Sequence, residues 1–122
     1  MPRNISFALT TRQFLDRTKD VTRRLGWKNL KAGDILCGCE KGMGFKPGEK
    51  IKRLGLIRAV SARREPLTSM WLEPYGTREA AREGFPDLTG AEFVLMFCKS
   101  MGNDESIEVT RIEYEYLEQG DE

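Results

Sequence analysis

The 122-residue chain contains no histidine, the side chain that most often carries protons at neutral pH. Acid–base chemistry must therefore come from another residue type. No apolar run approaches the roughly 20 residues that a membrane-spanning helix needs, and residues 1–6 lack the apolar segment of a secretory signal. Neither a glycine-rich phosphate loop nor a dinucleotide-binding fingerprint occurs. We therefore expect a cytoplasmic protein that has no membrane partner.

Cysteine is scarce as well. Cys37, Cys39 and Cys98 are an odd number in a chain long enough to fold without crosslinks, which points to reduced thiols. Without histidine, a metal site would need Cys98 together with a carboxylate or a second chain. The spacing of Cys37 and Cys39 is also not that of a zinc finger or ribbon. We therefore expect buried free thiols, with no metal and no cofactor.

The composition is that of an ordinary globular domain, with 39% hydrophobic and 32% charged residues. A chain of this length buries about two thirds of its unfolded surface around one core. We expect a single domain over residues 1–118, followed by a short acidic tail at residues 119–122.

The net charge of +1 hides a strong asymmetry along the chain. Residues 17–64 hold 14 Lys and Arg against 4 Asp and Glu, a balance of +10. Residues 65–122 hold 4 Lys and Arg against 14 Asp and Glu, a balance of −10. If the fold keeps these parts separate, one face is cationic and attracts phosphates. The alternative is that the parts interleave and their charges pair across strands.

Five segments have the alternation or the short apolar runs of β-strands, and they are residues 5–9, 21–24, 35–40, 56–64 and 109–117. A long basic loop, from about Lys41 to Leu54, separates the third and fourth of them. The last segment alternates strictly. Its pattern predicts one buried and one solvated face, formed by Ile112, Tyr114 and Tyr116 and by Arg111, Glu113 and Glu115, respectively.

Helix signals lie between these strands. Thr10 and Gln13 fit a capping box, and Thr89 and Glu92 fit a second one. Residues 77–83 form a further helical segment that Gly84 ends. The expected buried face of the last helix comprises Ala91, Val94, Leu95 and Cys98, widened by Phe93 and Phe97. Five or six strands with two or three short helices, without a βαβ rhythm, predict an α+β fold built on a small mixed β-barrel.

The segment from Arg17 to Arg24 concentrates groups that can carry chemistry. Lys19 precedes Thr22 by three positions, and Arg23 and Arg24 follow directly. A lysine accepts a proton at neutral pH only if burial or neighbouring cations lower its pKa. Residues three apart on a strand point to opposite faces, so Lys19 can meet Thr22 only from a loop before the strand. The alternative is an exposed basic stripe in which Thr22 is an ordinary strand residue.

Residues 19–24, KDVTRR, resemble the K-x-x-T-x-R element of the ASCH domain family, whose members adopt a PUA-like β-barrel. Lys31–Leu36 resembles the family's turn and following strand, and Glu83–Phe85 resembles its E-G-F segment before a helix. The closing strand also lies where the family has one. The likeness therefore covers most of the chain, although Arg17 stands where the family usually has glycine.

The resemblance implies a cleft that binds RNA or a modified nucleoside. In some small bacterial members it implies hydrolysis of an acyl amide on cytidine, as in N4-acetylcytidine. Carried over by position, Lys19 is the activating base, Thr22 the nucleophile and Glu83 a second acid or base. Two alternatives stay open: a non-catalytic reader of RNA or a modified base, and a single-strand ribonuclease that uses the same cleft.

Binding of a nucleotide calls for cations that face phosphate and for an aromatic ring that stacks on the base. The candidates for these roles are Arg17, Arg23, Arg24, Trp27, Lys28, Arg63 and Arg64. The sequence leaves the oligomeric state open.

Overall fold

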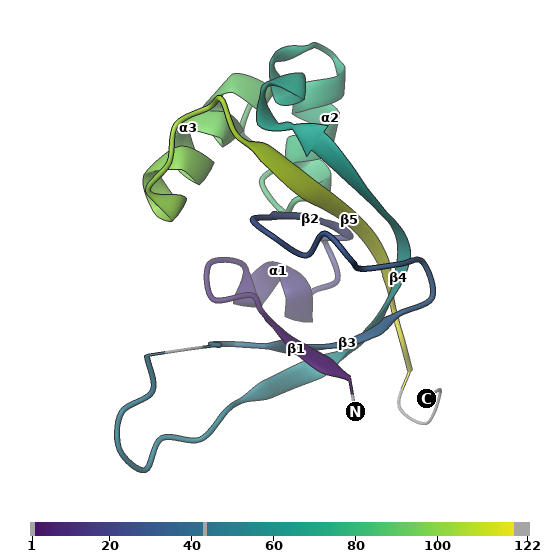
Figure 1. Cartoon of the computed structure of the whole chain (residues 1–122), viewed down its shortest axis with the longest axis vertical. Helices are drawn as coiled ribbons and strands as arrows, with labels where there is room; N and C mark the ends of the chain where they lie inside the picture. Colours follow the sequence, from purple (N-terminus) through teal and green to yellow (C-terminus); the bar gives the residue numbers. More distant parts are fainter. Residues whose placement is uncertain (1, 43, 119–122) are drawn as a thin grey trace.

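The computed structural model describes residues 2–42 and 44–118 (Figure 1), so the acidic tail expected at 119–122 lies outside the described residues. Its elements are β1 (Arg3–Ser6), α1 (Thr11–Leu15), β2 (Val21–Arg24), β3 (Ile35–Cys39), β4 (Arg53–Pro66), the 3₁₀ turn η1 (Leu67–Trp71), α2 (Tyr75–Arg82), α3 (Gly90–Met101) and β5 (Glu108–Tyr116). Within these ranges, no helix has the length and apolar character needed to cross a membrane.

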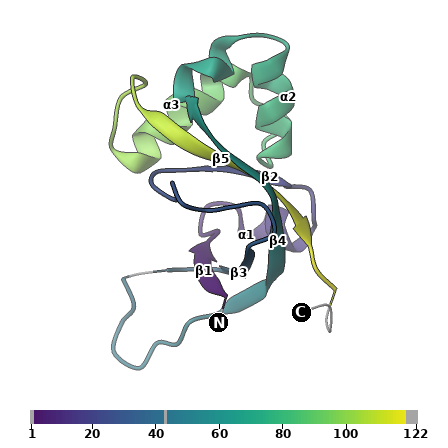
Figure 2. The ribbon, with the colours of Figure 1, turned by 45° about the vertical axis from the view of Figure 1, so that its right-hand side comes forward.

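The five strands form one mixed sheet in the order β1-β3-β4-β5-β2. Only β1 and β3 are parallel; the other neighbours are antiparallel. The 14-residue strand β4 changes register between Ala59 and Ser61, and such an irregularity bends a strand. The sheet curls around α1 into a half-barrel, with β1 and β2 at its edges (Figures 1 and 2). The α+β prediction and the five strands are confirmed. The described strands form an open curl, so the closed barrel that we expected is not shown.

The first of two hydrophobic cores fills the concave side of the sheet. It gathers apolar residues from β1, α1, the middle of β4 and β5. Phe14 of α1 enters this core, and its ring centroid lies 4.6 Å from that of Phe7. The short helix α1 is therefore held by the aromatic packing of one side chain.

The second core lies where the far ends of β4 and β5 meet the helices. Leu67 and Met70 of η1 pack against Phe93 and Phe97 of α3. Figures 1 and 2 both show α2 and α3 together at this end of the molecule, away from α1. Two cores thus form at opposite ends of β5.

Only one of the two expected capping boxes exists. The Thr89 side chain accepts a hydrogen bond from the Glu92 amide, and the Glu92 side chain accepts one from the Thr89 amide. Thr10 makes no such side-chain bond at the start of α1. Gln13 instead donates from Nε2 to the carbonyl oxygen of Gly84, 3.2 Å away. The prediction at Thr10 was wrong because a tertiary contact takes the glutamine that the box required.

The buried face of α3 is turned from the expected one. Gly90, Phe93, Val94 and Phe97 are buried, whereas Ala91 is exposed and Leu95 is 72% exposed. The buried positions follow a spacing of three and four residues, as one helix face requires. The wrong assignment arose because apolar residues occur all round this helix, so periodicity alone did not select the face.

The closing strand departs most clearly from its predicted alternation at Arg111. Ile112 and Tyr114 are buried as expected, but Arg111 is only 5% exposed. Its Nε donates to Oε1 of Glu79 at 2.7 Å, because α2 covers this part of the face that we expected to be solvated. The first strand is also shorter than expected, since β1 ends at Ser6 and Leu9 is 64% exposed.

Candidate functional site

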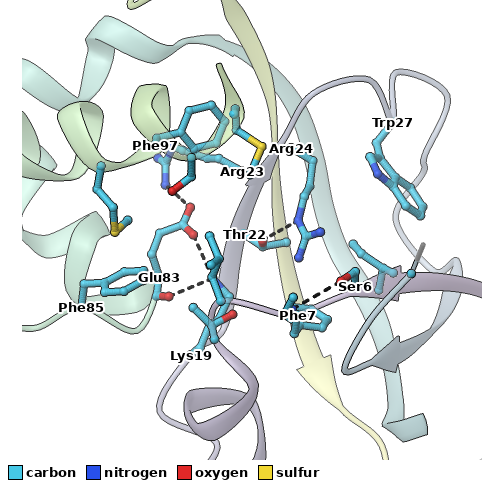
Figure 3. Close-up of a pocket in the computed structure, with 18 of the residues that line it drawn as sticks. Ser6, Phe7, Lys19, Thr22, Arg23, Arg24, Trp27, Glu83, Phe85 and Phe97 are labelled. Carbon is cyan, nitrogen blue, oxygen red and sulfur yellow. Dashed lines mark hydrogen bonds and ion pairs between the residues drawn. The ribbon is translucent and has the colours of Figure 1, made fainter. Parts of the chain in front are cut away.

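A cavity of about 540 Å³ lies between the two cores. Residues of β1, β2 and the turn after β1 form one part of its wall, and α3 with the chain after α2 forms the other. Among the residues that line it are Lys19, Thr22, Arg24 and Glu83 (Figure 3). The lysine, hydroxyl and carboxylate groups from distant parts of the chain therefore meet in one cavity.

Lys19 reaches the cavity from the loop between α1 and β2, as the spacing argument predicted. Arg17, in the turn that follows α1, has the left-handed φ of 59° that glycine adopts more readily. The turn that suits glycine thus forms with arginine. Beyond it, the carbonyl oxygen of Lys19 accepts hydrogen bonds from the hydroxyls of Tyr114 and Tyr116, and the Asp20 amide donates to Arg82 O at 3.0 Å. These bonds fix the backbone of the loop.

The Lys19 side chain is paired with Glu83. Its Nζ donates to Glu83 O at 2.8 Å and to Glu83 Oε1 at 2.9 Å, and the two residues are 2% and 3% exposed. Burial, the largest effect, lowers the pKa of Lys19; Glu83 opposes this, and Arg24 and Arg23 add to it. The net result is a pKa below the ordinary lysine value. This is the condition that a lysine must meet to accept protons.

Arg23 lies behind this pair and joins three carboxylates. Its Nη1 donates to Glu83 Oε2 at 3.0 Å, and its Nη2 donates to Glu65 Oε2 at 2.9 Å and to Glu79 Oε1 at 2.6 Å. Burial works to lower the pKa of Arg23, but these carboxylates outweigh it and raise the pKa. Arg23 therefore stays charged and is held by protein carboxylates.

Glu79 is the second centre of this network. It accepts hydrogen bonds from Arg23 and from Arg111, whose Nε lies 2.7 Å from Glu79 Oε1. Burial alone raises the pKa of Glu79, but the two arginines overcome it and hold the pKa at about 2. Tyr75 Oη closes the network by donating to Glu65 Oε1 at 2.6 Å. Glu79 therefore stays ionised, and hydrogen bonds connect it through Arg23 to the other two carboxylates.

The charges in this interior leave an excess of one cation. Three buried cations, Lys19, Arg23 and Arg111, stand against three buried carboxylates, Glu65, Glu79 and Glu83. Half-buried Arg24 adds a further positive charge at the cavity wall, since its pKa, lowered by burial, is still about 10. This excess positive charge favours a ligand that carries negative charge or electron-rich oxygens. Without such a ligand, it favours the neutral form of Lys19.

Thr22 is positioned by Arg24 and not by Lys19. Arg24 Nε donates to Thr22 Oγ1 at 2.9 Å, and the Arg24 guanidinium carbon lies 4.9 Å from the centre of the Phe7 ring. No hydrogen bond joins Lys19 to Thr22 in the described part of the chain. Both side chains nevertheless line the same cavity (Figure 3).

The remaining nucleotide-binding candidates lie in different places. Trp27 lines the cavity, and its ring lies under the Arg3 guanidinium, 4.1 Å from the ring centre. The other four, Arg17, Lys28, Arg63 and Arg64, lie outside the cavity lining. Arg63 Nη2 donates to Tyr75 Oη at 3.0 Å, and Arg64 Nη1 donates to Thr110 Oγ1 at 2.8 Å. The structure thus brings Arg23, Arg24 and Trp27 to the site.

Sequence reasoning missed the apolar part of the cavity wall. Phe85, Phe93, Met96 and Phe97 line it, although the pattern of α3 assigned its apolar residues to the core alone. It also missed the Glu65–Glu79–Arg111 part of the network, whose members are far apart in sequence. The available signals were the E-G-F segment, which places Phe85 beside Glu83, and the arginine within the otherwise regular final strand.

Comparisons with known proteins show the fold. No family model matches the chain, and no curated protein matches it. A crystal structure of protein EF3133 from Enterococcus faecalis, described under the family model DUF984, is similar with a TM-score of 0.62 and 14% sequence identity. The alignment covers 96% of this chain and 80% of that one. The chain therefore shares its curled α+β architecture with a protein of very different sequence.

Proposed function

We propose that this chain is an ASCH-type, PUA-like protein that binds a modified cytidine nucleoside or nucleotide and hydrolyses an acyl amide on N4 of the base. The observation that carries the proposal is the convergence of Lys19, Glu83 and Thr22 beside Arg24 in one cavity. Its volume of about 540 Å³ falls in the range of small-molecule sites. The match to the K-x-x-T-x-R element supports the same roles.

The chemistry can be assigned to these side chains. Thr22 Oγ1 attacks the acyl carbon, and neutral Lys19 takes its proton. The ammonium then gives that proton to the departing N4 amine, and the C–N bond breaks. Water releases the acyl group from Thr22 as a carboxylic acid. Arg24, which donates to Thr22 in the free protein, supplies positive charge beside the developing oxyanion.

The ligand-free geometry requires one rearrangement. Lys19 Nζ is held by Glu83, so it must exchange one of these contacts for the threonine hydroxyl when substrate enters. Catalytic hydrogen bonds often tighten only in the substrate complex. Glu83 then remains as the carboxylate that orients the lysine.

The same observation favours a second candidate, a non-catalytic reader of the modified base. In that case the Lys19–Glu83 pair and Arg24 recognise polar edges of the ligand, and Thr22 takes no part in bond breaking. The two candidates differ in turnover and not in binding.

Hydrolysis of N4-acetylcytidine to cytidine and acetate, followed by chromatography, tests the proposal. We expect Thr22→Val and Lys19→Arg to reduce kcat by at least about a hundredfold, because each removes a group that acts in proton transfer or attack. Thr18→Val is the matched control, since this exposed threonine lies outside the cavity. Binding of N4-acetylcytidine without turnover by the unmutated protein supports the reader, and absence of both overturns the proposed function.

The pH dependence of kcat/KM provides a separate test. Only neutral Lys19 can accept the proton of Thr22, so activity is lost as the pH falls below the pKa of Lys19 and gained as it rises. Because burial lowers that pKa below the ordinary 10.5, we expect the rise to be complete at a lower pH than for an exposed lysine. A profile without this rising limb contradicts the role of Lys19 as base.

A further inference from the structure

The cavity has two chemically different ends on either side of Thr22. On one side lie Arg24 and Trp27, and on the other lie Phe85 and Phe97, as Figure 3 shows. Glu83 lies on the second side as well, where Lys19 and Arg23 occupy its carboxylate oxygens. Phe93, whose ring centroid lies 6.1 Å from those of Phe85 and Phe97, and Met96, which packs against the same core, also line the cavity. We call the part lined by Phe85, Phe93, Met96 and Phe97 the apolar lobe.

The apolar lobe is preformed in the ligand-free protein. The ring centroids of Phe85 and Phe93 lie 6.1 Å apart, as do those of Phe93 and Phe97. Phe93 and Phe97 are buried and belong to the core between α3 and η1. Core packing therefore holds the rings in place, so the lobe is present before a ligand arrives.

The size of the cavity exceeds what an acetyl group needs. An apolar cavity of about 150 Å³ is enough to hold benzene, whereas this cavity measures about 540 Å³. A cytosine ring with a two-carbon acyl group beside Thr22 therefore leaves space. That space lies partly against aromatic and thioether side chains, which gain from contact with apolar groups.

Only one part of an N4-acylcytidine suits such a wall. The ring edge of cytosine and the ribose carry polar atoms that need hydrogen-bond partners, which three phenyl rings and a thioether do not offer. The acyl chain begins at the carbon that Thr22 attacks and has no such need. The cationic side, with Arg24 and Trp27, then remains for the base and sugar.

We propose that the apolar lobe holds the acyl group, and that the preferred substrates carry acyl groups larger than acetyl, such as butanoyl, hexanoyl or benzoyl. This inference rests on the proposed function, because it assigns the acyl group of that substrate to one end of the cavity. The reaction itself is unchanged: the amide C–N bond breaks, water supplies the new carboxylate oxygen, and N4 gains a proton to become the free amine.

The test measures kcat/KM for acetyl-, butanoyl-, hexanoyl- and benzoylcytidine, and also the binding of each to the Thr22→Val variant by calorimetry. We expect binding to tighten by about three- to fourfold for each methylene that enters the lobe. Met96→Trp fills the lobe, so it should reduce the hexanoyl-to-acetyl ratio of affinities by at least tenfold. Leu95→Trp is the matched control, because this neighbour on α3 is 72% exposed.

The outcomes separate the two proposals. Turnover of the acetyl compound with no gain for longer chains overturns the lobe assignment and leaves the proposed function intact. An affinity that grows with the length of the acyl chain, together with loss of this growth in Met96→Trp, supports the lobe assignment. That holds even if the unmutated protein hydrolyses none of the compounds. In that case only the catalytic assignment fails. If neither kcat/KM nor the calorimetric affinity depends on the length of the acyl chain, the inference is overturned.

Discussion

At the scale of single residues, Glu83 holds the site together. Its two carboxylate oxygens accept from Lys19 and from Arg23, at 2.9 and 3.0 Å, and all three residues are buried. Charged groups out of water are tolerable only when their partners are in place. The carboxylate that the proposed chemistry requires is therefore also a structural residue.

Replacing this carboxylate by an amide tests its structural role. We expect Glu83→Gln to lower the free energy of unfolding by about 3–5 kcal/mol, because it leaves two buried cations without their shared partner. Urea denaturation measures the change. Glu115→Gln is the control: Glu115 pairs with Arg58 on the surface, and such a pair contributes at most about 1 kcal/mol. Equal losses in the two variants contradict the buried network.

At the scale of elements, short helices are placed by contacts outside themselves. The five-residue helix α1 is held by Phe14 in the first core and by the bond from Gln13 to Gly84. The longer helix α3 has a complete capping box, a glycine with φ of 70° at its end and a buried face. Helix α3 therefore depends more on its own sequence than helix α1.

Two threonine substitutions distinguish these cases. We expect Thr89→Ala to destabilise the protein by about 1 kcal/mol, because it removes the side-chain acceptor at the start of α3. Thr10→Ala removes no capping bond and should cost less than half as much. Thermal and urea unfolding of the pair measure the difference. If Thr10→Ala costs as much as Thr89→Ala, the assignment of the caps is wrong.

At the scale of the whole molecule, the two oppositely charged parts of the chain interleave. Arg58 of β4 lies 2.7 Å from Glu115 of β5, and Arg64 lies 3.2 Å from Glu108 on the same pair of strands. Arg82 pairs with Asp20 at 3.0 Å. The sequence allowed either a separate cationic face or charge pairing across strands, and these contacts are of the second kind. The buried groups around the cavity retain an excess of one cation.

This distribution predicts a weak dependence of ligand binding on salt. We expect the affinity for N4-acetylcytidine to change by less than about twofold between 50 and 200 mM salt, because a nucleoside displaces few counterions. Single-stranded RNA should show a shallow slope, equivalent to about one or two phosphate contacts. Fluorescence anisotropy at several salt concentrations measures it. A steep slope contradicts the interleaved charges and favours an RNA-binding face.

Several parts of the site could be predicted from sequence because they depend on local geometry. Lys19 had to lie before the strand to approach Thr22, and the structure places it in that loop. The convergence of Glu83 with Lys19 came from the family resemblance, since 64 positions separate the two residues. The partners of Arg23 and Arg111 had no local signal, because carboxylates on β4, on α2 and at the end of α2 provide them.

The amino-acid sequence by itself determined the strands, the capped helix α3 and the loop position of Lys19. Each of these follows from side-chain alternation, backbone hydrogen bonding and steric limits within a few residues. The tertiary structure alone decided which face of α3 is buried, that α2 covers Arg111, and that Arg24 rather than Lys19 holds the Thr22 hydroxyl. These outcomes depend on distances between segments far apart in the chain, and ion pairing and packing fix those distances only when the elements assemble.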